Sequence, residues 1–445
     1  MRRLLLSTLV AFSTALYALP AAEIPPVLEA AALLPAQTLK GQHYTVSRDV
    51  TGDGFLLDYV LLSDFGPFRA RGPGVLAQRI HEIDALAALK KMEDSEAFKK
   101  GFANARKDTA KDFRAIATSP IDTLSGIPSG VGRFFERTTL AASTGIRQLG
   151  HLQAAHEGKT APDGPGVKLP GKDGAAAVPL PGVAGETARL TGRVAVDVFG
   201  YDRVRRMIAR EVQVDPYTTN PVLKERLDEL AHTAFAGNLG IAIIKAALPA
   251  TLAVDTAGTL STFVWDMLPG DLRVDNKKRL LALGASEDAV NMLLAKHWFT
   301  MSSQTRFAHA LSRLKGVPGA TEALAFADTV VSEEQALFVV NTVEMLAHYH
   351  EHQAPLTEIV ARGTLMGRTG GGELVVVAPV DYLTWSGQLE RFLDHDDVRS
   401  GKRSAWLSGR ASPVARKALK EAGWELHEGV DWAPVRLQAL MAIKS

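Results

Sequence analysis

Residues 357–378 read TEIVARGTLMGRTGGGELVVVA, and in this stretch the chain changes from helical to strand-forming sequence. Runs of aliphatic and β-branched residues, 357–365 and 373–378, flank the Thr-Gly-Gly-Gly turn at 369–372. Two such runs separated by glycines predict two strands joined by a tight connection.

Strand and helix patterns alternate after this pair. A short helix is predicted over 388–394, a strand over 404–407, a second helix over 413–422 and a strand over 424–427. Because helical crossovers join parallel strands, this order indicates a small, partly parallel sheet with right-handed crossovers.

The only other strand-forming region lies near the N-terminus, at 43–71. Asp53-Gly54 separates two β-rich runs, which is a strong hairpin signal. Phe65-Gly66-Pro67-Phe68 turns the chain again. The pattern predicts a small antiparallel meander.

Between these two regions the sequence is helical, since apolar residues recur every three or four positions from Gly74 onward. Helix starts are marked by Asn220-Pro221, by Ser286 and by the capping box Ser332 to Gln335. We therefore expect a predominantly α-helical α+β protein. It comprises an N-terminal small antiparallel meander, a central helical body and a C-terminal small α/β unit of the βαβαβ type.

Residues 159–185 mark the clearest boundary in the chain. Eleven of these 27 residues are Gly or Pro, without hydrophobic periodicity, which is typical of a linker or exposed loop. The expected regions are a signal peptide (1–22), a β-meander with a helical region (23–158), the linker (159–185), a helical region (186–354) and a small α/β region (355–445).

The first 22 residues have the features of a secretory signal peptide. Arg2 and Arg3 precede an apolar run, Leu4 to Leu16, and small residues end at Ala22. The run is too short to span a bilayer comfortably. We expect cleavage near Ala22, no transmembrane helix after cleavage, and a periplasmic or secreted mature protein.

The composition excludes several classes of chemistry. The chain has no cysteine, which rules out disulfides, a thiol nucleophile, cysteine-ligated zinc and iron–sulfur clusters. A bacterial periplasm suits a disulfide-free exported chain better than a eukaryotic extracellular space. With 50 basic and 49 acidic residues and no basic stripe, nucleic acid is not an expected partner.

Glu344, His348 and His352 form a candidate metal site. Residues four apart share one face of a helix, so one carboxylate and two imidazoles could bind zinc or iron. The alternative is a solvated helix C-terminus, where histidines interact favourably with the helix dipole. Under this alternative no cofactor is expected.

A candidate anion site lies at Ser408, Gly409, Arg410 and Ser412, between a predicted strand and a predicted helix. Free backbone N–H groups at a helix start attract phosphate or carboxylate, and open α/β sheets place ligands at this end of their strands. The alternative is an ordinary cap, since Ser412-Pro413 is a favourable helix start.

Arg133, Phe134 and Phe135 are a candidate lipid or partner contact. Adjacent aromatic and basic side chains in a Gly- and Pro-rich segment suit a membrane interface or a partner groove. Burial in the core is the alternative. The apolar segment 234–254 is interrupted by polar residues and is expected to be a core helix.

These observations give two candidate functions. The first is a soluble exported cell-envelope protein with a non-enzymatic interaction or scaffold role, whose partner is an envelope protein or a membrane surface. The second is a metal-dependent periplasmic hydrolase that uses the Glu344, His348 and His352 face.

Overall fold

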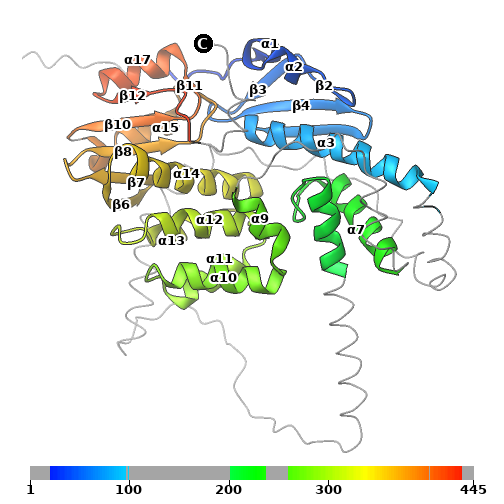
Figure 1. The fold of residues 1–445 in the computed structure, drawn as a ribbon. Coiled ribbons are helices and arrows are strands. Elements are labelled where there is room, and N and C mark those ends of the chain that lie inside the picture. The colour runs from blue at the N-terminus through cyan, green and yellow to red at the C-terminus, as the bar shows by residue number, and fades with distance from the viewer. Residues whose placement is uncertain (1–20, 97–98, 100–200, 237–258, 400, 433–445) are drawn as a thin grey trace, which may run out of the picture.

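The computed structural model describes residues 21–96, 99, 201–236, 259–399 and 401–432 (Figure 1). Helices and strands are mixed among them, which confirms the α+β class. Residues 1–20, the linker 159–185 and the segment with Arg133, Phe134 and Phe135 lie outside the described residues.

The N-terminal strands form an antiparallel sheet around β4 (Leu57–Ser63). β2 (Tyr44–Val46) and β3 (Asp49–Gly52) pair with successive parts of one edge of β4, and β5 (Gly66–Arg71) pairs along the other. β1 (Leu28–Glu29) pairs with β3 and leads into the short helices α1 (Ala30–Leu33) and α2 (Ala36–Leu39). The antiparallel hairpin predicted around Asp53-Gly54 is confirmed.

One helix covers this sheet, and a second helix from a distant part of the chain packs on the first. α3 (Pro73–Asp94) packs on β4 and β5, and α7 (Pro221–Ala236) packs on α3. A helical stretch at 201–211 completes this N-terminal core. The predicted start of α7 is confirmed, since the Asn220 Oδ1 accepts from the backbone N–H groups of Val222 and Leu223.

The described helices between residues 259 and 352 form a layered stack that supports the C-terminal sheet (Figure 1). Its members are α9 (Thr259–Asp266), α10 (Pro269–Leu281), α11 (Glu287–Ala295), α12 (Met301–Arg313), α13 (Glu322–Asp328) and α14 (Glu333–His352). The predicted caps Ser286 and Ser332 both accept backbone N–H groups. The Gln335 side chain accepts from the Val331 N–H rather than closing a capping box on Ser332.

The C-terminal sheet has the order β12-β10-β8-β7-β6. β8 (Leu374–Ala378), β10 (Arg403–Leu407) and β12 (Glu425–His427) are parallel. α15 (Gly387–Leu393), α16 (Asp396–Arg399) and α17 (Pro413–Glu421) lie between them in sequence, and short β9 (Tyr382–Leu383) pairs with β11 (Arg410–Ala411). The predicted alternation is therefore confirmed.

The single strand predicted over 357–365 is wrong. The chain turns back at Gly363, which adopts a φ of 68°, a backbone conformation that favours glycine. β6 (Leu356–Arg362) and β7 (Thr364–Thr369) consequently form a hairpin of their own before β8 begins.

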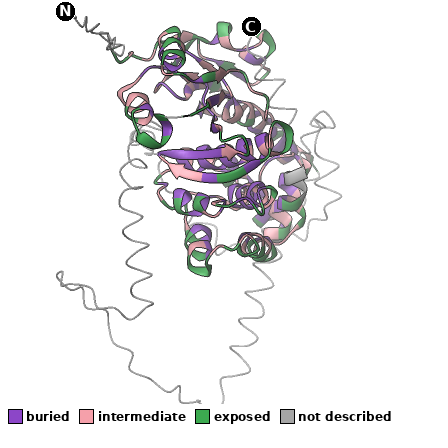
Figure 2. Cartoon of the chain, turned by 90° about the vertical axis from the view of Figure 1, so that its left-hand side faces the viewer, coloured by how far each residue is buried: buried purple, intermediate pink, exposed green. Residues whose placement is uncertain are grey.

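Both faces of this sheet are covered. Trp406 packs edge-on against Tyr349 of α14, with ring centroids 5.1 Å apart. Because side chains alternate along a strand, its neighbours Ala405 and Leu407 lie on the opposite face, toward α15 and α17. Figure 2 shows buried residues on inner faces and exposed residues on outer faces. Among the described helices, none is both long and apolar enough to cross a bilayer.

The two cores are joined by an apolar side chain from the N-terminal sheet. Phe55, in the β3–β4 turn, is 5% exposed and packs within the C-terminal core. Phe55→Ala is expected to lower the free energy of unfolding by about 3–4 kcal/mol, as for other buried phenylalanines. Urea unfolding measures this change. Leu62→Ala, at a side chain that is 56% exposed, is the control and should change stability by less than about 0.5 kcal/mol.

Candidate functional site

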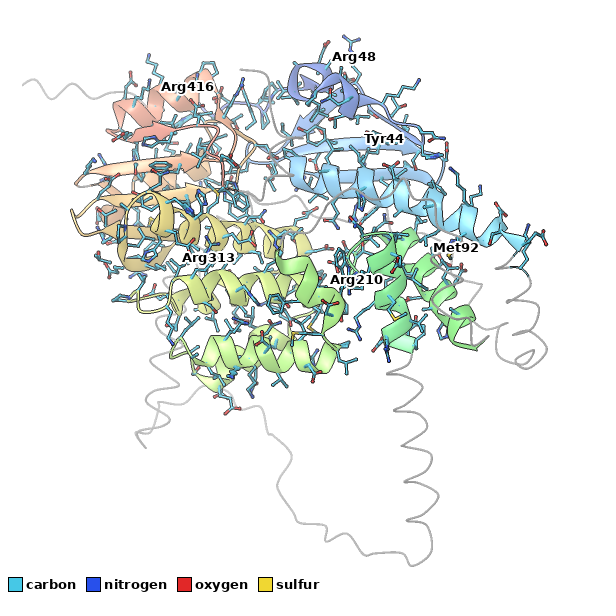
Figure 3. All side chains as sticks on the ribbon, in the orientation of Figure 1. Tyr44, Arg48, Met92, Arg210, Arg313 and Arg416 are labelled. Carbon is cyan, nitrogen blue, oxygen red and sulfur yellow. The ribbon has the colours of Figure 1, made fainter. Side chains whose placement is uncertain are left out.

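Glu344 of the expected metal face forms an ion pair with α12. The Arg306 Nε and Nη2 donate to its two carboxylate oxygens at 3.0 and 2.7 Å. Seven residues further along both helices, Arg313, labelled in Figure 3, donates to Glu351. These two pairs, two helical turns apart, tie α12 to α14.

The two histidines of that face lie against each other. The His348 and His352 rings stack with centroids 4.2 Å apart, and the His352 Nδ1 is 3.0 Å from the His348 carbonyl oxygen. Burial, followed by the neighbouring His352, lowers the pKa of His348. In the part of the chain that the structure describes, no group of three His, Asp or Glu side chains is arranged to hold a metal ion.

The expected anion site at 408–412 is engaged in intramolecular contacts. The Ser408 hydroxyl donates to the Val380 carbonyl at 2.7 Å. Gly409 permits a close approach, since a Cβ there would lie 2.0 Å from the Asp381 carbonyl oxygen. The Arg410 N–H donates to that same oxygen at 3.0 Å. Ser412 caps α17 by accepting from the Ala415 N–H.

A carboxylate of the chain itself lies at the start of α17. The Glu23 Oε2 accepts from the Ser412 hydroxyl at 2.5 Å and from the Trp385 N–H at 2.6 Å. The Glu23 N–H donates to the Trp385 carbonyl at 2.8 Å. The Glu23 carboxyl thus lies at the helix start where the sequence predicts an anion site.

A second polar centre, not predicted from sequence, lies where the N-terminal sheet meets α14. Arg71 forms a bidentate pair with Asp58 at 2.8 and 2.7 Å. Its Nη1 lies 3.8 Å from the Asp53 Oδ2 and 3.5 Å from the Glu334 Oε2. A single guanidinium therefore faces three carboxylates.

Asp381 adds a fourth carboxyl to this junction. It follows β8, and its Oδ2 accepts from the Leu57 N–H at 2.8 Å. Burial, together with the charges of Asp53 and Asp58, raises its pKa to about 8, against the opposing effects of the Leu57 hydrogen bond and Arg71. Because its charged form would be desolvated beside other carboxylates, Asp381 holds a proton at neutral pH.

Several buried polar atoms at this junction have no hydrogen-bond partner among the described residues. They are the Asp53 Oδ2, the Tyr59 hydroxyl, the Arg71 Nη1 and the Glu334 Oε2. Burial and the neighbouring Asp381 raise the pKa of Tyr59. The arrangement can hold and release a proton at Asp381.

One sequence signal could have indicated this junction. Asp381 follows a buried parallel strand, at the end of the sheet where α/β proteins place functional groups. Its partners at 53–58 and 71 lie some 300 residues away, and no local pattern connects them.

Comparisons with known proteins give no match, either to a family model, to a curated protein or to a solved structure. The functional assignment therefore rests on the chain's own residues.

Asp381→Asn is expected to change how stability depends on pH. The folded pKa of about 8 lies above the unfolded value of about 3.9. The folded protein thus binds an extra proton between about pH 4 and 8, and this contribution to stability is lost as the pH rises through that range.

Asparagine cannot ionise, so the stability of Asp381→Asn relative to the wild type should rise across that range. The slope is at most about 1.4 kcal/mol per pH unit. Urea unfolding at successive pH values measures it. Asp49→Asn, at an exposed position of β3, is the control and should follow the wild type; a parallel curve for Asp381→Asn would contradict the assignment.

Proposed function

We propose that this chain is an exported cell-envelope protein with a non-enzymatic interaction or scaffold role, and that its partner is an envelope protein or a membrane surface. The observation that carries the proposal is the anchoring of Glu23. This residue directly follows the expected cleavage position near Ala22 and bonds to Trp385 and Ser412 through its backbone and side chain.

Removal of the signal segment is compatible with these contacts. Ala21 and Ala22 are exposed. Cleavage after Ala22 would convert the Glu23 amide into an α-ammonium group, which can still donate to the Trp385 carbonyl. The new terminus would thus be held by the C-terminal unit.

The contacts of the candidate polar residues favour a scaffold over a hydrolase. Glu344 accepts both hydrogen bonds of the Arg306 fork, and Ser412 binds Glu23 while capping α17. Side chains that could have served as ligands or catalysts are instead engaged in contacts within the protein. Arg133, Phe134 and Phe135 stay the proposed contact with a lipid surface or a partner.

Export can be tested by expressing the full chain in a bacterium with a periplasm. We expect the protein in the periplasmic or secreted fraction, with an N-terminus near Glu23 by intact mass and terminal sequencing. Leu9→Asp, which places a charge in the apolar run, should leave unprocessed protein in the cytoplasm. Wild-type protein that retains Met1 and stays in the cytoplasm would refute the proposal.

Glu23→Ala is expected to destabilise the exported protein by about 1.5–3 kcal/mol, because it removes a carboxylate that accepts two hydrogen bonds. Urea unfolding of the processed protein measures the loss. Glu29→Ala removes an exposed carboxylate and should have little effect. Equal effects of the two variants would show that Glu23 is not an anchor.

A further inference from the structure

The C-terminal sheet covers an apolar cavity on the face opposite α14. The cavity has a volume of about 60 Å³ and lies between the strands and the helices α15 and α17. Apolar side chains form most of its wall, among them Val376, Ala378, Ala405, Leu407 and Leu419. The cavity is partly open to solvent, so a small molecule can reach it.

The cavity wall also includes a hydrogen-bond donor without a partner. Trp424 lines the cavity, is 4% exposed, and its indole N–H finds no acceptor among the described residues. The ring is held in place, since the Arg403 guanidinium lies 5.6 Å from its centroid and donates to the Ala422 carbonyl. A buried donor left without an acceptor is costly.

Two polar residues of one helix also line the cavity. Gln388 and Arg391, both on α15, lie in its wall alongside the apolar residues. The wall is thus mostly apolar and includes an indole ring and an arginine. A negatively charged acceptor can accept the hydrogen bond of the indole N–H and is attracted by the positive charge of the arginine. An ammonium group can do neither.

We propose that this cavity binds a small apolar carboxylate, with the alkyl chain against the β8 and β10 side chains and the carboxylate near Trp424 and Arg391. The volume indicates a small ligand. A cavity of about 60 Å³ is several times larger than the roughly 10–15 Å³ that one water needs. The ligand class is therefore a short-chain fatty acid, represented here by pentanoate.

The head group is tested first, with three ligands of equal chain length. Isothermal titration of the full chain at pH 7 compares pentanoate, pentan-1-ol and pentan-1-amine. Pentanoate should bind most tightly, at roughly millimolar affinity as expected for about seven non-hydrogen atoms. The alcohol should bind more weakly and the amine not measurably. No binding of pentanoate, or equal binding of all three, would overturn the proposal.

Three variants locate the binding site. Ala405→Leu fills the cavity and should weaken pentanoate binding at least tenfold, while Ala282→Leu, the same change at an exposed position, should not. Trp424→Phe keeps an aromatic wall without the N–H and should weaken pentanoate binding several-fold. Arg391→Gln should weaken pentanoate but not pentan-1-ol.

If Ala405→Leu does not fold, as judged by circular dichroism, the Trp424 and Arg391 variants show whether pentanoate binds in this cavity. Unchanged pentanoate binding in both would assign it to another part of the chain and refute this site. The outcome does not depend on export, because all measurements are made on purified protein.

Discussion

The docking of the β3–β4 turn on the loop after β8 holds the two halves of this protein together. The Asp381 carboxyl accepts from the Leu57 N–H, and the Asp381 N–H donates to the Phe55 carbonyl at 2.7 Å. Phe55 then packs in the C-terminal core. The turn approaches the loop closely at Gly54, where a Cβ would overlap the Thr384 hydroxyl.

This contact places a carboxyl group where its charged form is unfavourable. Arg71 is a single cation shared among Asp58, Asp53 and Glu334, so a further negative charge on Asp381 would have little compensation. The hydrogen bond from Leu57 stabilises the charged form, yet burial outweighs it. The junction is therefore more stable with Asp381 protonated, and its stability falls as the pH rises toward the pKa of Asp381.

The Glu23 anchor links the same two regions by a different kind of interaction. Its carboxylate lies at the start of α17, where the helix dipole and the Ser412 hydroxyl favour negative charge. The two acidic residues thus lie in different surroundings within one interface: burial raises the pKa of Asp381, whereas the Glu23 carboxyl accepts hydrogen bonds from Ser412 and Trp385.

The sequence predicted the helix starts correctly because these depend on contacts between residues that are close in the chain. Asn220, Ser286 and Ser332 were identified as helix starts because a cap satisfies N–H groups two or three residues away. The turn at Gly363 was missed, since a glycine inside an aliphatic run is equally compatible with a continuous strand. Asp381 and Glu23 were missed for another reason. Their partners lie 324 and 389 residues away, a separation over which sequence periodicity carries no information.

Sequence patterns do not report contacts between distant residues, which also explains why the sequence indicated a metal site at the histidine-rich helix end and gave no sign of the cavity. Histidines and glutamates four residues apart form a pattern that can be read along one helix, but the arginines of α12 that pair with the glutamates lie outside that pattern. The cavity instead is lined by residues from strands, helices and loops, and their numbers range from 55 to 424. In the sequence, each of these residues alone resembles an ordinary core residue. Of the two faces of the C-terminal sheet, the one facing α14 is closed by Tyr349 and Trp406. The opposite face combines an open volume with the unpartnered Trp424 N–H, and a ligand would satisfy both features at once.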